Sequence, residues 1–221
     1  MLKKVLLTVS GILLVVIVVI YFSPYRYIFK AVGIIYLTGH TSAFLTDYQY
    51  FHNEKVPAAA YPQPWPFHEK YNTKKISDSL EALNKKAKTV AYLVIKNDSL
   101  FFEKYYEDYG PDSKSNSFSM AKSILSALLG KAISEGHIKS LDQPINTISG
   151  KAFIYKSGAT QLLGMAMENA LDQKLNRYLN KSFWQELGAE KEAIWQVDSK
   201  KRVLKSFYAA LPATPEILHI L

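Results

Sequence analysis

An uncharged stretch near the N-terminus limits how this chain can fold. From Val5 to Phe22 there is no charged residue, and most of the side chains are aliphatic. A helix of that length crosses the hydrocarbon core of a bilayer, about 30 Å thick, with little tilt. Because Lys3 and Lys4 precede the stretch, the positive-inside rule places the residues after Tyr25 outside the cytoplasm. We therefore predict a single-pass membrane anchor, residues 1–22, with an extracytoplasmic (periplasmic) domain.

No small-residue cleavage site follows the apolar stretch, which favours an uncleaved anchor over a secretory peptide. A second apolar run, Ala31 to Leu37, is too short to span a bilayer and could lie at its surface. We interpret residues 23–73 as a linker because prolines and aromatic residues interrupt any periodicity there. The aromatic residues Trp65 and Phe67 could instead dock against the domain, and the sequence leaves both options open.

Composition excludes several kinds of protein. The net charge is +8, but the lysines are scattered among acidic residues, so the sequence favours an anionic bilayer surface over nucleic acid as partner. There is no cysteine, which rules out disulfides and thiolate metal sites. The five histidines show no paired spacing, so we expect neither a metal nor a cofactor. The oligomeric state cannot be predicted.

The stretch from Ser117 to Ile145 predicts a buried, one-sided helix. Gly136 stands where a left-handed residue would end it. Ser119 and Lys122 lie three residues apart in the first turn, so their Cβ atoms should be roughly 5–6 Å apart on one face. Partial burial and the positive end of the helix dipole both favour a neutral Lys122 amine, able to take the Ser119 proton. The apolar stripe consists of Ile124, Leu125, Leu128, Leu129 and Ile133.

By itself the Ser-x-x-Lys spacing also fits a capped surface helix with an incidental lysine. Its context is more specific: FSMAKS comes first, then an apolar helix rich in small residues, then E-G-x-I-x-x-L-D-x-P-I. This order resembles the β-lactamase-related serine hydrolases, which include class C β-lactamases, penicillin-binding DD-peptidases and related esterases. The resemblance implies a mixed fold of the α+β type, with a central antiparallel sheet flanked by helices and the catalytic site between two lobes.

A second match lies near residue 155. The family places a Tyr-x-Asn or Tyr-x-Ser motif before a helix that contains L-L-G, and this chain has Tyr155 and Ser157 there. The resemblance implies that Tyr155 is a partner base and that Ser157 orients the leaving group in the substrate-binding site. Alternatively, Tyr155 is a packed aromatic residue and Ser157 caps a helix. Lys156-Ser157-Gly158 spells the third family motif, K-S/T-G, but we reject it because that motif belongs on a strand.

Local patterns predict further elements upstream of the first motif. Residues from Lys74 to Lys88 have the periodicity of a charged helix whose apolar stripe is Ile76, Leu80, Leu83 and Ala87. Val90 to Lys96 and Leu100 to Tyr106 predict two antiparallel strands joined by a turn at Asn97-Asp98. In the resembling family this hairpin begins the central sheet.

The chain also departs from the family. A long segment expected between Ser119 and Tyr155 is missing, and residues 146–151 resemble a join across the deletion. The resemblance covers residues 74–201. The tail, residues 202–221, lies outside it, and one hypothesis is that a shifted reading frame produced it. We predict only two strands of an incomplete sheet, no K/H-S/T-G strand, and a weakly stable domain.

These observations lead to one functional prediction with two alternatives. We predict a membrane-anchored serine hydrolase that acts on an amide or ester through an acyl-enzyme and is impaired by the shortening. The catalytic residues are Ser119, Lys122 and Tyr155, with Ser157 in substrate binding. The alternatives are a non-catalytic module that binds cell-wall-like peptides and a purely structural membrane protein. The substrate cannot be predicted.

Overall fold

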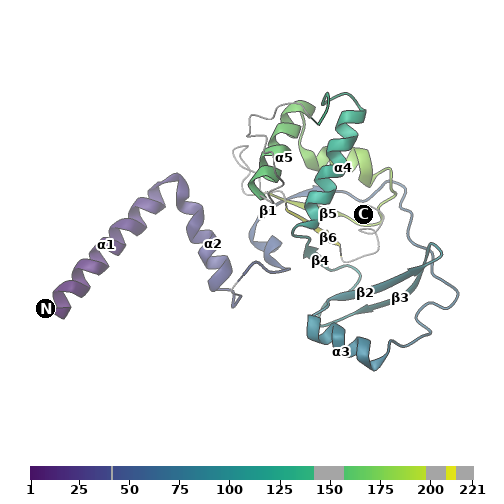
Figure 1. Ribbon diagram of the computed structural model, residues 1–221, viewed down its shortest axis with the longest axis horizontal. Helices are drawn as coiled ribbons and strands as arrows, with labels where there is room; N and C mark the ends of the chain where they lie inside the picture. Colours follow the sequence, from purple (N-terminus) through teal and green to yellow (C-terminus); the bar gives the residue numbers. More distant parts are fainter. Residues whose placement is uncertain (41, 142–156, 198–207, 213–221) are drawn as a thin grey trace. The chain divides into compact units, whose positions relative to one another are not determined.

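The computed structural model describes residues 1–40, 42–141, 157–197 and 208–212 (Figure 1). These residues form two compact units, Met1–Tyr50 and Phe51–Leu221.

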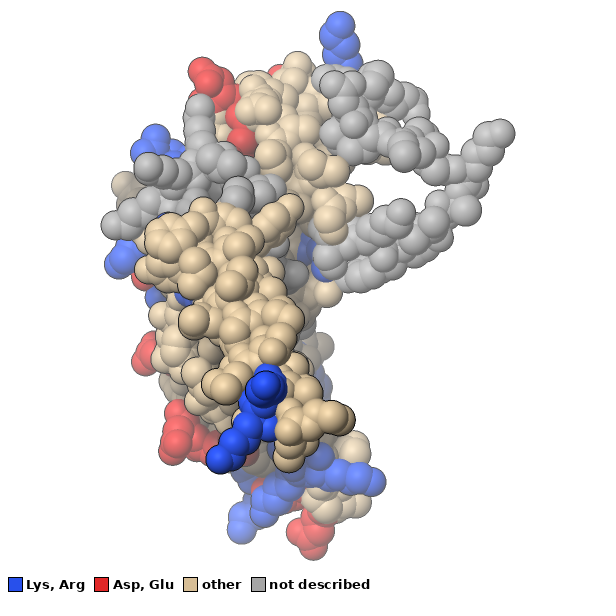
Figure 2. All heavy atoms as spheres, turned by 90° about the vertical axis from the view of Figure 1, so that its left-hand side faces the viewer, with Lys and Arg blue, Asp and Glu red and all other residues tan. Residues whose placement is uncertain are grey.

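The first unit begins with α1 (Leu2–Phe22), which has no buried residue. By length and composition alone, it can cross a membrane, and no other helix in the described part of the chain can. Its surface faces the viewer in Figure 2 and is almost entirely uncharged, with blue basic side chains gathered near one end. The helix stops at Ser23, whose hydroxyl donates to the Ile20 carbonyl (2.9 Å) and accepts from the Tyr25 amide (3.0 Å). Ser23 therefore satisfies backbone groups on both sides of the bend.

A short 3-10 turn, Pro24–Arg26, leads into α2 (Tyr27–Tyr36), and a second such turn, Asp47–Tyr50, ends the unit. Asp47 is buried, and one of its carboxylate oxygens accepts from the Phe44 amide at 2.6 Å.

The second unit contains a four-stranded antiparallel sheet with the order β1-β5-β6-β4. Its strands are β1 (His52–Val56), β4 (Lys114–Asn116), β5 (Ala193–Val197) and β6 (Tyr208–Pro212). Two of these differ from the sequence prediction. β1 comes from the expected linker, residues 23–73, and β6 comes from the tail, residues 202–221. The prediction of only two strands is therefore wrong, although the sheet is small.

The region after β1 also packs on the domain through its backbone. The Ala59 amide donates to the Ala189 carbonyl (2.8 Å), and the Gln63 amide donates to the Gly188 carbonyl (2.7 Å). The Gln185 side chain donates to the Ala58 carbonyl at 3.0 Å. Further along, the Leu100 amide donates to the Pro66 carbonyl (2.8 Å), and the His68 amide donates to the Leu100 carbonyl (3.0 Å). Of the two aromatic residues in the docking alternative, Trp65 is half-buried and Phe67 is 66% exposed.

Helices pack on one face of the sheet to form the core (Figure 1). They are α4 (Met120–Ser134), α5 (Ser157–Leu171) and α6 (Leu175–Leu179), which continues into a π-helical turn, Asn180–Trp184. Alternate residues of β5 enter this core, as the period of two in a strand requires. The largest buried side chains are Trp184, Trp195, Tyr178, Leu125, Leu128 and Met167.

The predicted hairpin is present as β2 (Ala91–Lys96) and β3 (Ser99–Tyr105), which pair antiparallel. Asn97 and Asp98 have φ of 49° and 55°, the left-handed pair that a two-residue hairpin turn of type I′ needs. This part of the prediction is confirmed. The expectation that the hairpin begins the central sheet is wrong, because β2 and β3 form a sheet of their own.

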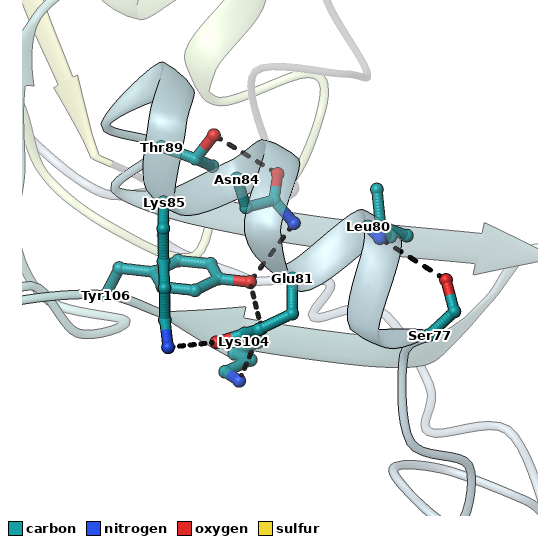
Figure 3. A network of polar contacts seen from close by, with 8 residues as sticks. All are labelled: Ser77, Leu80, Glu81, Asn84, Lys85, Thr89, Lys104 and Tyr106. Carbon is teal, nitrogen blue, oxygen red and sulfur yellow. Dashed lines mark hydrogen bonds and ion pairs between the residues drawn. The ribbon is translucent and has the colours of Figure 1, made fainter.

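α3 (Asp78–Ala87) begins four residues later than predicted, where the Ser77 side chain caps it by accepting from the Leu80 amide at 3.3 Å. Its buried side also differs from the predicted stripe, because Leu83 is 58% exposed and Asn84 is buried. Figure 3 shows why: Asn84 donates to the Tyr106 hydroxyl at 3.1 Å, and that hydroxyl donates to Glu81 at 3.0 Å. Polar side chains therefore hold α3 on the hairpin.

Candidate functional site

A strand, a tight turn and a helix present Ser119. β4 ends at Asn116, α4 begins at Met120, and Ser119 occupies the N-cap position between them. The Ser119 side chain is exposed, whereas Asn116 and Ser117 just before it are buried. A hydroxyl at the tip of such a turn is accessible to a substrate while its backbone stays anchored at both ends.

The turn contains one unusual backbone conformation. Phe118 has φ of 47°, in the left-handed region that non-glycine residues seldom occupy. Asn116 holds it there, since its side-chain oxygen accepts from the Phe118 amide at 3.0 Å. The Ser117 carbonyl accepts from the Met120 amide at 3.0 Å and closes the turn. Left-handed residues of this kind cost about 1–3 kcal/mol and concentrate at functional sites.

Lys122 lies beside the exposed hydroxyl. Its Nζ is 3.1 Å from Ser119 Oγ, with the ammonium donating to the hydroxyl oxygen. The Lys122 side chain is half-buried. A neutral amine at the same distance could accept the hydroxyl proton instead, and 3.1 Å is within the range required of a general base. The geometry therefore permits the activated serine that the spacing predicts.

The helix that carries both residues is fixed along its length. Ile124, Leu125 and Leu128 are each at most 2% exposed, and Leu129 and Ile133 pack against the same core. The predicted stripe is thus confirmed. Such burial means that the backbone that carries Ser119 and Lys122 cannot shift without disturbing the core.

The C-terminal end of α4 is tied to α6. Tyr178 donates to Glu135 at 2.7 Å, and Gly136 has the predicted left-handed conformation with φ of 78°. Burial, together with the hydrogen bond to Glu135, raises the pKa of Tyr178 to about 12. The same hydrogen bond, helped by Lys131, lowers the pKa of Glu135. The pair therefore stays a phenol and a carboxylate through the physiological range.

The other predicted site residues lie at or beyond the edge of the described structure. Tyr155, Lys156 and the expected join at residues 146–151 fall outside the described residues. Ser157 is the first residue of α5, but its side chain is not among those described. The predicted helix after it is confirmed, and Met167 in it is fully buried. The structure therefore brings Ser119 and Lys122 together and leaves the other two assignments as predictions.

Sequence reasoning missed the residues that shape the turn. Asn116 and Phe118 carry no catalytic chemistry, but they set the backbone on which Ser119 stands. The available signal was an Asn two residues before the turn, a position from which its side chain commonly bonds to the backbone. Among the described residues, no group of three or more His, Cys, Asp or Glu could hold a metal ion.

Comparisons with known proteins bear mainly on the fold. A scan against protein-family models gives no match, and a search of curated proteins gives none either. Among solved structures, the chain is similar to a protein described as a "Putative 6-aminohexanoate-dimer hydrolase from Bacillus anthracis", with a TM-score of 0.61 and 14% sequence identity. The alignment covers 85% of this chain and 66% of that chain.

The fold is β-lactamase-like. Helices are mixed with small antiparallel sheets, and the sheet is incomplete, as predicted from the sequence. This chain spans just under two thirds of the length of the similar structure. A likeness at 14% identity shows the fold alone, because one fold hosts many different activities.

Proposed function

We propose that this protein is a membrane-anchored serine hydrolase that uses Ser119 as its nucleophile and acts on an amide or ester. The observation that carries this proposal is the 3.1 Å distance between Lys122 Nζ and Ser119 Oγ at the start of a buried helix. The β-lactamase-like fold supports it, because an S-x-x-K pair at this helix start is typical of the resembling hydrolases. The long apolar helix α1 supports the anchoring.

Ser119 and Lys122 together account for the first half of the reaction, the acylation of Ser119. With Lys122 as a neutral amine, Ser119 Oγ bonds to the substrate carbonyl carbon as its proton passes to Lys122 Nζ. The carbonyl oxygen becomes an oxyanion that backbone N–H groups stabilise. When the tetrahedral intermediate collapses, the bond to the leaving amine or alcohol breaks, and Lys122 returns the proton to that group. The product is an ester between Ser119 and the acyl group.

The second half requires water to attack this ester and release the acid. We propose that Tyr155 assists the proton transfers and that Ser157 orients the leaving group, as the resemblance implies. The printed sequence has a K/H-S/T-G tripeptide only at residues 156–158, where α5 begins. That tripeptide therefore does not lie on a strand of the described residues.

The first substrate class to test is a short linear amide. The similar structure is described as a "Putative 6-aminohexanoate-dimer hydrolase", and amino acids in a dimer are joined by an amide bond. β-Lactams, peptides with D-amino acids and short esters are the other classes that the resemblance includes.

Active-site labelling tests the nucleophile directly. The intact protein in detergent is incubated with a fluorophosphonate probe, and the modified peptide is identified by mass spectrometry. We expect a single adduct on Ser119 that is lost in Ser119→Ala and greatly slowed in Lys122→Met. Ser123→Ala is the matched control, since Ser123 is also exposed near the start of α4. It should label like the parent protein.

The outcomes separate the alternatives. Labelling that persists in Ser119→Ala, or labelling at Ser123, would show that Ser119 is not the nucleophile. An unlabelled protein that still binds cell-wall-like peptides would support the non-catalytic binding module. With a chromogenic ester, we expect a burst of about one product per protein followed by slow turnover, the pattern of an acyl-enzyme that accumulates.

A further inference from the structure

The helix α2 exposes an apolar face in the first unit. Tyr36 is 65% exposed and Val32 is 47% exposed. Both residues come shortly after the candidate membrane span in the sequence. Large exposed apolar side chains that gather on one face indicate an interaction surface. The residues concerned are Ile28, Phe29, Val32 and Tyr36.

These side chains share one side of the helix. At 3.6 residues per turn, Ile28, Val32 and Tyr36 follow one another at intervals of four, and Phe29 lies next to them. Ile34 lies on the other side and is buried at 8% exposure. The helix therefore turns one apolar side chain inward and leaves a separate apolar face outward, which we call the outer face (Ile28, Phe29, Val32 and Tyr36).

The connection to α1 limits what can cover this face. Only Ser23 to Arg26 separate the end of α1 from the start of α2. Four residues span at most about 14 Å when fully extended, so α2 begins within or next to the headgroup layer wherever α1 spans the bilayer. A contact between the rings of Tyr21 and Phe29, with centroids 6.4 Å apart, ties the two helices more closely still.

The length and charge of α2 fit a position in the plane of the membrane surface. Ten residues of helix measure about 15 Å, which is too short to cross a bilayer. Arg26, just before the helix, and Lys30, on the same side as Ile34, are exposed and lie off the outer face by helical spacing. The sequence contains no acidic residue before Asp47. Basic side chains beside an exposed apolar face are a feature of helices that lie on anionic bilayers.

We propose that α2 is a second membrane-contacting element. It lies in the outer headgroup layer, with the outer face against the acyl chains and Arg26 and Lys30 among anionic headgroups. This proposal rests on the anchoring of α1 that forms part of the proposed function. Two contacts with the bilayer hold the chain after Tyr36 near the membrane, so the hydrolase would act on substrates at the membrane surface.

The absence of cysteine in the sequence makes a single-probe experiment possible without further changes. Full-length variants Val32→Cys and Lys30→Cys are each labelled with an environment-sensitive fluorophore. They are reconstituted into vesicles of phosphatidylcholine with a minority of phosphatidylglycerol. Val15→Cys within α1 reports on the anchor. Tyr61→Cys, at a position 86% exposed in the second unit, reports on water.

We expect the Val32 probe to be quenched several-fold more by spin-labelled lipid than by aqueous iodide. The Lys30 probe, from the opposite side of the same helix, should show the reverse. If the Val15 probe is in lipid but the Val32 probe is quenched by iodide as strongly as the Tyr61 probe, the anchor stands and the α2 proposal is overturned. If the Val15 probe is also in water, the anchoring itself fails, and the α2 proposal fails with it.

Discussion

The helices α3 and α4 belong to the same unit but are held in different ways. α4 buries Ala121, Ile124, Leu125, Leu128 and Ala132, all of them apolar. α3 buries a single residue, Asn84, and its other contacts with the hairpin include the ion pair between Glu81 and Lys104, at 2.8 Å (Figure 3). Apolar burial stabilises a helix strongly and depends little on pH or salt. Half-exposed ion pairs contribute little and are screened by salt.

This difference places the candidate nucleophile on the more strongly held helix. Pre-organised catalytic groups need supports that do not move, and a close-packed apolar stripe provides one. The hairpin and α3 carry no predicted site residue, so looser packing there has no direct cost for the chemistry.

The largest effect is expected from truncating a leucine in each helix. Leu128 in α4 is completely buried, so Leu128→Ala should lower the free energy of unfolding by about 2–5 kcal/mol. Leu83 in α3 is 58% exposed, so Leu83→Ala should change it by less than about 0.5 kcal/mol. Urea unfolding in detergent, followed through the buried Trp184 and Trp195, measures both. Equal losses would show that the two helices are held alike.

Two asparagines of equal burial test whether a loss of protein stability by itself changes the reactivity of Ser119. Asn116 and Asn84 are both 6% exposed, and each bonds to a group beside it. Replacing either by Ala removes a half-buried hydrogen bond and should cost about 0.5–1.5 kcal/mol. Only Asn116→Ala should also slow fluorophosphonate labelling of Ser119, because it frees the Phe118 turn. If Asn84→Ala slows labelling as much, Asn116 has no special positioning role.

The same contrast explains what the sequence could and could not predict. The α4 stripe and Gly136 were predictable because apolar spacing and a helix stop are local signals. The buried side of α3 was not, because Asn84 finds its partner Tyr106 on another element, and apolar periodicity cannot detect a polar network. Likewise, β1 has only Val56 as an apolar residue, so its pairing with β5 depends on a distant segment.

In the candidate site, too, some residues could be predicted from the sequence and others could not. Ser119 and Lys122 could be predicted because three residues along a helix fix their distance without any tertiary information. The left-handed Phe118 could not, because a bulky aromatic residue gives no signal for that conformation. The turn becomes interpretable only once Asn116 is seen to accept the Phe118 amide.

The ends of the two helices give a smaller prediction. α4 is followed by Gly136 at φ of 78°, whereas α3 ends at Lys88 with φ of 53°. A left-handed residue other than glycine is strained, so Lys88→Gly should stabilise the protein by about 0.5–1 kcal/mol. Gly136→Ala should destabilise it by a similar or slightly larger amount, since an added Cβ meets no atom within 4 Å and only the backbone is strained. Opposite shifts in the urea midpoint are expected, and shifts of the same sign would contradict this account.

The smallest effect concerns pH and is confined to the α3 region. The hydrogen bond from Lys104 lowers the pKa of Glu81, so its contribution to stability is present above the pKa of an unfolded glutamate, about 4.3. That contribution is lost as the pH falls through the lower pKa of the folded state. The same bond raises the pKa of Lys104, so its contribution is present below the unfolded lysine pKa, about 10.4, and is lost at higher pH.

Glu81→Gln removes the acid-side dependence of this pair and leaves the shape of the side chain. Amide hydrogen exchange, measured in both proteins at matched pH, should show that the advantage of the parent protein in β2 and β3 shrinks as the pH falls from 6 to about 3. Amides of α4 should show no such difference, because apolar burial, rather than this carboxylate, protects them. A pH-dependent difference in α4 as large as that in the hairpin would mean that the two regions unfold together. The different contacts that hold α3 and α4 would then cause no difference in local unfolding.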